Sequence, residues 1–345
     1  MHKYIQFGTR RIGLDYPPLV IAEIGINHNG SLQVAQEMAL SAIKAGAEVI
    51  KHQTHIPNAE MSEEAKHTIP GNSSDSIYDI MARCALNETD ERALKDFIET
   101  SGALFLSTPF SFAAVDRLER FGVNAYKIGS GEMNNLPLVS YIAKTKKPIF
   151  LSTGMNDLRS VHRTVDAITQ FHDQFVLLHT TNLYPTPAHL IRLGALEQLK
   201  NDFPGEIIGL SDHSQDNLAC LAAVALGASV LERHFTDSKE RPGEDICCSM
   251  TPQELTVLIE NSARISQMRG GIKQAAPEEQ VTIQFAFSSV VAARDLRAGE
   301  KIKKEDLTTK RPSGGIPAAE LEQVIGKTTR HPIAGGKQIQ WEDIQ

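Results

Sequence analysis

The chain has 345 residues, and its 35 basic and 42 acidic residues leave a net charge of −7. No basic stripe interrupts this acidic balance, which argues against nucleic acid as a partner. No apolar run reaches the length of a membrane span, and the N-terminus lacks the apolar segment of a secretory signal. Four cysteines (Cys84, Cys220 and the adjacent Cys247 and Cys248) suit a reducing compartment in a chain of this length, so we expect a cytoplasmic protein that binds no membrane.

Eight short apolar runs each end in a cluster of polar residues. They cover residues 19–28, 49–55, 104–109, 125–132, 149–154, 175–182, 207–213 and 230–234. Continuous apolar runs are typical of strands that are buried on both faces. The stretches between them alternate at helical period, so the order strand, helix, strand predicts an α/β fold with a parallel sheet.

Eight such units within about 250 residues predict a (β/α)8 barrel, the TIM barrel, with its catalytic groups on the rim formed by the strand C-termini. An open doubly wound sheet is the alternative, but it would concentrate its site at one switch point. We assign residues 1–268 to the barrel and residues 269–282, rich in Gly, Ala and polar residues, to a linker. Residues 283–345, with short β-like segments, are expected to form a small second domain.

Two histidines stand at matching places on the last two predicted strands. Residues two apart on a strand point to the same side, so Ser211 shares a face with His213, and Glu232 shares one with His234. In a closed barrel these strands are neighbours, and two imidazoles can then reach one divalent cation. The alternative is a pair of hydrogen-bonded core histidines; two histidines are too few for a structural zinc site.

Two lysines, Lys51 and Lys127, lie inside apolar strands, where a charge is costly without a partner. Neutral donors follow neighbouring strands: Thr108, Ser130, Ser152, Asn182 and Ser211. Together they predict a pocket for phosphate and carboxylate groups. The alternative is a set of bridges inside the barrel to Glu23, Glu132 and Glu232. A long insertion at about residues 55–87 is expected to bring Asn72 over the site.

Motifs along the whole barrel closely resemble those of the bacterial sialic acid (N-acetylneuraminate) synthases. They are EIGINHNG (23–30), KHQTH (51–55), PGN (70–72), STPF (107–110), KIGSGE (127–132), STGM (152–155), YPTP (184–187), GLSDH (209–213) and ERHF (232–235). The tail, with FAF at 285–287 and KRP at 310–312, resembles the antifreeze-like (SAF) domain of the same family. One departure is Ser313, where the family has glycine after Arg-Pro.

The resemblance implies a transferase that condenses phosphoenolpyruvate with N-acetylmannosamine and uses a divalent metal, Mn²⁺ foremost, with Mg²⁺ or Co²⁺ as substitutes. His213 and His234 match the metal ligands. The positions that match the phosphoenolpyruvate pocket are Lys51, Thr108, Lys127, Ser130, Ser152, Asn182 and Ser211. The positions that match sugar-binding residues are Glu23, Gln53, Asn72, Tyr184 and Asp245. Phe285 and Arg311 match residues that one subunit of a homodimer places over the sugar in its partner's barrel, a domain swap.

The implied reaction joins the enol carbon of phosphoenolpyruvate to the metal-polarised aldehyde of the open-chain sugar, adds water and releases phosphate. The expected catalytic groups are Glu23, Lys51, Glu132 and Glu232. Among them Lys51, with Lys127, screens the accumulating charge, and Glu132 takes the proton of the water.

Three other functions stay open. A legionaminic or pseudaminic acid synthase of the same family would keep every group above and change only the sugar contacts. A Schiff-base lyase or aldolase would use Lys51, since a buried amine near another cation has a lowered pKa. A non-catalytic binder of anionic sugars is the third, and the histidine pair argues against it.

Overall fold

Eight parallel strands form the sheet at the centre of the structure, a computed structural model that describes residues 2–70 and 74–345. They are β3 (Leu19–Gly25), β4 (Val49–Thr54), β5 (Leu104–Pro109), β6 (Tyr126–Ile128), β7 (Ile149–Ser152), β8 (Phe175–Thr180), β9 (Ile207–Asp212) and β10 (Val230–His234). Each strand lies beside its neighbour in sequence, and the first pairs with the last, β3 with β10. The nearly closed ring confirms the predicted TIM barrel, and the open-sheet alternative is wrong.

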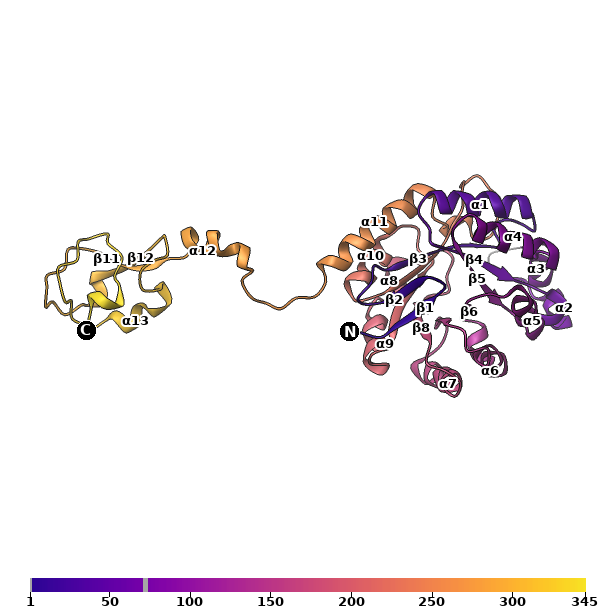
Figure 1. Cartoon of the computed structure of the whole chain (residues 1–345), viewed down its shortest axis with the longest axis horizontal. Coiled ribbons are helices and arrows are strands. Elements are labelled where there is room, and N and C mark those ends of the chain that lie inside the picture. The colour runs from indigo at the N-terminus through magenta and orange to yellow at the C-terminus, as the bar shows by residue number, and fades with distance from the viewer. Residues whose placement is uncertain (1, 71–73) are drawn as a thin grey trace. The chain divides into compact units, whose positions relative to one another are not determined.

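Helices follow the strands and cover the outside of the sheet (Figure 1). The long ones are α1 (Leu32–Lys44), α4 (Glu88–Thr100), α5 (Phe112–Phe121), α6 (Leu136–Ala143), α7 (Leu158–Thr169), α9 (Gly194–Asp202), α10 (Leu218–Ala225) and α11 (Pro252–Met268). Several begin at a Ser, Thr, Asn or Asp whose side chain accepts a hydrogen bond from the first turn, such as Ser31, Asp157 and Thr251. The insertion after β4 contains α2 (Pro57–Glu60), a 3-10 turn (Glu63–His67) and α3 (Ile77–Cys84).

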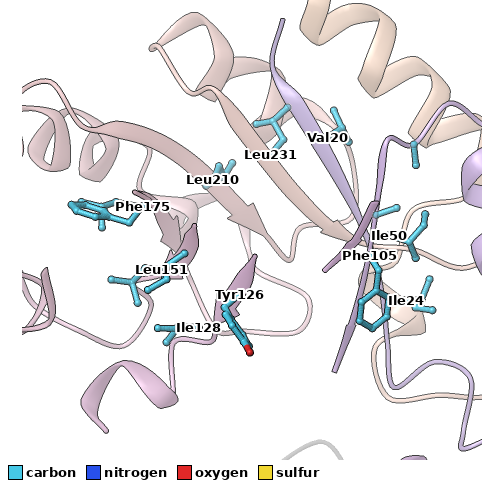
Figure 2. Packing of buried hydrophobic residues seen from close by; sticks show 14 of the residues in the cluster. Val20, Ile24, Ile50, Phe105, Tyr126, Ile128, Leu151, Phe175, Leu210 and Leu231 are labelled. Atoms are coloured by element: carbon cyan, nitrogen blue, oxygen red, sulfur yellow. The ribbon is translucent and has the colours of Figure 1, made fainter. Parts of the chain in front are cut away.

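The apolar residues of the barrel fall into two layers. Side chains that point from the strands to the helices form the larger layer, shown for Val20, Phe105 and Leu231 in Figure 2. Inside the ring, a smaller layer is capped by the hairpin β1 (Tyr4–Phe7) and β2 (Arg10–Gly13), whose Phe7 packs edge-on against Phe150. The interior is therefore filled with apolar residues at one end.

Polar side chains take over the interior toward the carboxyl ends of the strands. On β4, for example, the inward positions run from the buried Val49 to Lys51 and Gln53, while His52 and Thr54 face the helices. This alternation places Lys51 at the carboxyl end of the barrel, where Lys127 and Glu232 of other strands also lie.

A boundary between Gly270 and Gly271 divides the chain into two units. In the second unit, α12 (Gln280–Ala286) precedes an antiparallel pair, β11 (Ser289–Ala292) and β12 (Leu307–Lys310), and α13 (Leu321–Val324) follows. Its separate core includes Val290, Ile302 and Ile339. Among the described residues, no helix is both long and apolar enough to cross a bilayer, and all four cysteines are free.

Candidate active site

A cavity of about 410 Å³ opens at the carboxyl ends of the barrel strands. It gathers side chains from all eight strands or the loops that follow them. The predicted site residues that line it are Lys51, Gln53, Thr108, Lys127, Ser130, Glu132, Ser152, Asn182, Tyr184, Ser211, His213, Glu232, His234 and Asp245. Glu23 lies just behind this lining and is fully buried. Asn72 lies outside the described residues.

Lys51 is held by two carboxylates. It donates a hydrogen bond to Glu23, and its Nζ lies 3.6 Å from Oε1 of Glu232. Burial alone would lower the pKa of Lys51, but the two carboxylates outweigh it and raise the pKa. Lys51 therefore carries a stable positive charge.

Lys127 is less well compensated than Lys51. Its Nζ donates to Oγ of Ser152 at 2.6 Å and lies 3.8 Å from Oε1 of Glu232. Burial lowers its pKa to about 8, because the single carboxylate at that distance does not offset desolvation. A bound anion would supply the missing negative charge.

The lysine–carboxylate ion pairs that the sequence offered as an alternative are therefore present, and Glu23 and Glu232 are the partners of the lysines. Glu132 is different: no lysine within the described ranges pairs with it, and burial raises its pKa. Glu232 is ionised, since Lys127 and Lys51 outweigh the effect of burial and lower its pKa. The cavity thus contains two carboxylates with opposite shifts in pKa, the arrangement that separates acid and base roles.

Hydroxyl and amide groups complete the wall near Lys127. Oγ of Ser130 accepts a hydrogen bond from the backbone N–H of Gly154 at 3.0 Å. A side chain on Gly154 would collide with Asn182, so the glycine makes room for both polar groups. Oδ1 of Asn182 is buried and has no hydrogen-bond partner in the described part of the chain. Sequence reasoning did not single out Gly154, because its role depends on a neighbour from another strand.

The two predicted metal ligands lie side by side. The ring centroids of His213 and His234 are 5.4 Å apart, and Tyr184 stacks on His213 at 4.1 Å. Nδ1 of His213 lies 2.8 Å from the carbonyl oxygen of Thr181, so it carries the proton and donates. Burial lowers the pKa of His213 to about 3, and Nε2 of the neutral ring keeps a free lone pair.

These groups fit a metal site with two protein ligands. Nδ1 of His234 is buried without a hydrogen-bond partner among the described residues, and it lies 3.5 Å from Asp245. Within residues 2–70 and 74–345, no group of three or more His, Cys, Asp and Glu side chains could hold an ion. An ion on this pair would take its other ligands from water or substrate.

On the predicted sugar side, Gln53 is fixed at both ends of its amide. Its Nε2 donates to Glu23 at 2.8 Å, and its Oε1 accepts from Nε2 of His55 at 3.0 Å. His55 in turn bonds Glu60 at 2.8 Å and stacks on Phe110 at 4.1 Å. This chain of contacts gives Gln53 a single orientation toward the cavity.

An apolar wall faces the same cavity, and sequence reasoning missed it. It is formed by Ile26 and Phe110 together with Ile77, Ile80 and Met81 of α3. The spacing of the last three, i, i+3 and i+4, marks one helix face and was the available signal. The periodicity of a helix specifies which residues share a face, but not which surface that face contacts.

Phe285 and Arg311 belong to the second unit. Phe285 is 58% exposed, and the neighbouring Phe287 is 60% exposed. The Arg311 side chain is exposed and has no hydrogen-bond or ion-pair partner in the described part of the chain.

Two family models and several known proteins match the chain. Residues 38–274 match the NeuB family and residues 287–345 match the SAF domain. The chain is 38% identical to the N,N'-diacetyllegionaminic acid synthase of Campylobacter jejuni, over 90% of this chain and 95% of the relative. It is 33% identical to the enzyme of that name in Legionella pneumophila, over 98% of both chains. The crystal structure of a sialic acid synthetase from Leptospira borgpetersenii, in complex with citrate, matches with a TM-score of 0.75 and 28% identity, over 82% of this chain and 96% of that one.

Proposed function

The chain belongs to the NeuB family of sialic-acid-type synthases, and we propose that it condenses phosphoenolpyruvate with N-acetylmannosamine to form N-acetylneuraminate and phosphate. The observation that carries the proposal is the under-compensated charge of Lys127, buried beside Ser152 in a cavity lined with hydroxyl groups. We place the reaction in the cytoplasm, whose reducing conditions suit four free cysteines.

The anionic substrate would lie across the two lysines. Lys51 and Lys127 would hold its carboxylate and phosphate, with donors from Thr108, Ser130, Ser152, Asn182 and Ser211 around them. These side chains are buried, so charge–charge contacts are stronger than in water, and the hydroxyl groups of Ser130, Ser152 and Ser211 are already held by hydrogen bonds. The enol carbon of phosphoenolpyruvate then attacks the sugar aldehyde, water adds to the former enol C2, and phosphate leaves.

Two carboxylates would take different parts in this reaction. Glu132, whose pKa burial raises, is the proposed base for the water, because a base is most effective when its pKa lies close to the working pH. Glu232 stays ionised and keeps both lysines charged. Glu23 accepts hydrogen bonds from Lys51 and Gln53, and through them it would position the hydroxyl groups of the sugar. Tyr184 and Asp245 line the same side of the cavity.

His213 and His234 would hold a divalent metal, which we propose is Mn²⁺, with Mg²⁺ or Co²⁺ as substitutes. When bound, the ion would supply Lewis-acid polarisation of the aldehyde oxygen. The chain's contribution is two imidazole rings, of which the neutral ring of His213 is held in a fixed tautomer by the carbonyl of Thr181.

We propose further that two chains form a symmetric dimer in which each second unit caps the partner's barrel. The support comes from residues in α12 or directly after α12 and β12. Phe285 and Phe287 expose large apolar surfaces, and Arg311 has five donors without a partner in the described ranges. Exchange of the same element between two subunits requires two-fold symmetry.

The apolar wall favours a second candidate, an N,N'-diacetyllegionaminic acid synthase like the relatives from C. jejuni and L. pneumophila. A product with two N-acetyl groups needs a sugar substrate with two acetamido groups, one more methyl than N-acetylmannosamine offers. Ile77, Ile80 and Met81 could bury that extra methyl.

The deciding experiment measures phosphate release from phosphoenolpyruvate with a panel of N-acetylated hexosamines, and identifies each product by mass spectrometry. We expect the largest kcat/KM with N-acetylmannosamine and none without a sugar. A clear preference for a diacetamido sugar would replace the first candidate by the second. Absence of phosphate release with every sugar and metal would overturn the synthase proposal.

A further inference from the structure

Arg233 is the largest fully buried side chain in the described part of the protein, and it does not line the cavity. It stands on β10 between Glu232 and His234, both of which do. Alternation along the strand turns Arg233 to the opposite side, toward the helices. A buried guanidinium is costly to desolvate unless its donors are met, so its partners indicate what it holds.

The partner across the sheet is Asp212, which pairs in register with Arg233 on the neighbouring strand β9. Asp212 likewise stands between two cavity residues, Ser211 and His213. Its Oδ2 lies 3.4 Å from Nε of Arg233. The two charges therefore oppose each other directly behind the cavity-facing side chains.

Both groups also bind the loop that follows His213. The carboxylate of Asp212 accepts hydrogen bonds from the backbone N–H of Ser214 at 3.0 Å and from its hydroxyl at 2.7 Å. Nη2 of Arg233 donates to the carbonyl oxygen of Ser214 at 2.7 Å. The backbone N–H, the hydroxyl and the carbonyl oxygen of Ser214 are thus all hydrogen-bonded to this pair, and Ser214 directly follows His213.

The guanidinium reaches two more segments. Nη1 donates to Oδ1 of Asn217 at 2.6 Å, and Asn217 donates to the carbonyl oxygen of Glu254 in α11 at 2.8 Å. Nη2 lies 3.5 Å from the carbonyl oxygen of Cys248. Cys248 belongs to the short 3-10 turn Ile246–Cys248, which begins directly after the cavity residue Asp245. One side chain therefore joins the strand of His234 to the segments that carry His213 and Asp245.

We propose that Arg233 and Asp212 are positioning residues that set the separation and orientation of His213 and His234 for a divalent metal, without touching substrate. This inference rests on the metal site of the proposed function. Two ligands from different strands can share an ion only if the strand ends are fixed to a fraction of an ångström. Lysine keeps the charge of Arg233 but has no planar fork, so it cannot make the same contacts at once.

The experiment uses the full-length protein and three variants, R233K, D212N and R117K. Arg117 is the matched control, because it forms another buried ion pair, with Glu91 at 2.9 Å, that involves neither His213 nor His234. Binding of Mn²⁺ alone is measured by electron paramagnetic resonance of the free ion, and thermal unfolding is measured in parallel. We expect all three variants to have a lower Tm, and R233K and D212N to bind Mn²⁺ at least tenfold more weakly, with R117K at the wild-type affinity.

Each other outcome is decisive. Wild-type affinity for Mn²⁺ in R233K and D212N overturns the inference even if both are less stable, and an equal loss in R117K shows a general effect of destabilisation. If R233K does not fold, the affinity of D212N for Mn²⁺ decides alone, because asparagine has nearly the size of aspartate. If D212N does not fold either, the pair is required for folding and the inference is overturned. Wild-type protein that releases phosphate yet binds no Mn²⁺ contradicts the metal site itself and leaves the synthase proposal standing.

Discussion

The rings of His213 and His234 lie 5.4 Å apart at the ends of two adjacent strands, and the Nδ1–H of His213 is committed to the carbonyl of Thr181. We expect His213→Ala and His234→Ala each to lower kcat/KM on the order of 100-fold or more, since each removes one of two protein ligands. EDTA should abolish phosphate release and Mn²⁺ should restore it. His162→Ala, at an exposed histidine paired with Asp202, is the control. Full activity after exhaustive chelation would end the metal hypothesis.

The pKa of Lys127 predicts how phosphoenolpyruvate binding depends on pH. Because burial lowers this pKa to about 8, Lys127 loses its charge above pH 8, and the KM for phosphoenolpyruvate should rise there. The same titration does not unfold the protein: above pH 8 the unfolded chain binds the extra proton, so through this group stability increases with pH up to the unfolded pKa.

Steady-state kinetics from pH 6.5 to 9.5, a range of roughly 1.5 units on either side of that pKa, would measure this dependence. Lys127→Met should remove the alkaline rise and increase KM about tenfold or more at lower pH. Lys95→Met, at a buried lysine paired with Glu99 outside the cavity, should keep the wild-type profile. An unchanged alkaline rise in Lys127→Met would show that another group is responsible.

Lys51 should not form a Schiff base. Glu23 and Glu232 raise its pKa, so the neutral amine that attacks a carbonyl is scarce. We expect that borohydride with pyruvate leaves the mass of the protein unchanged, as judged by intact mass spectrometry. Trapping of pyruvate on Lys51, located by peptide mapping and absent from Lys51→Met, would instead support the lyase or aldolase mechanism.

N-acetylmannosamine should be a better substrate than its 6-phosphate. The sugar side of the cavity presents neutral Gln53 and Tyr184 and the carboxyl group of Asp245, while Lys51 is already paired. Among the described residues of this barrel, that side of the cavity holds no unpaired Lys or Arg that could bind a second phosphate. We expect kcat/KM to be lower for the 6-phosphate than for N-acetylmannosamine, by a factor of roughly ten or more. A preference for the phosphorylated sugar would refute the substrate assignment.

Hybrid dimers would test whether the second unit acts on its partner. Arg311→Ala and His213→Ala should each be nearly inactive alone. After subunit exchange, the barrel of the first variant and the tail of the second can form one intact site, so about half of the hybrid dimer's sites should recover. Exchange is followed with two affinity tags. No recovery in purified hybrids would mean that the tail acts on its own barrel or not at all.

Much of the barrel could be predicted because its signals are local. Each strand is a continuous apolar run, and helices begin at residues such as Ser31 and Thr251, whose side chains meet the free N–H groups of the first turn. Strand alternation also separates Lys51 and Gln53, which face the cavity, from His52, which stacks on Phe105 outside the ring. These features depend only on residues close together in the sequence.

The electrostatic state of the site was decided by tertiary structure alone. Lys51 and Lys127 occupy similar strand positions, yet the pKa of one is raised and that of the other is lowered. The difference arises because Glu23 lies beside Lys51, whereas Glu232, 3.8 Å away, is the only carboxylate within 4 Å of Lys127 among the described residues. The energy of a buried charge changes steeply with distances of a few ångströms between side chains from different strands. Such distances are set by how the ring closes, which no local pattern in the sequence records.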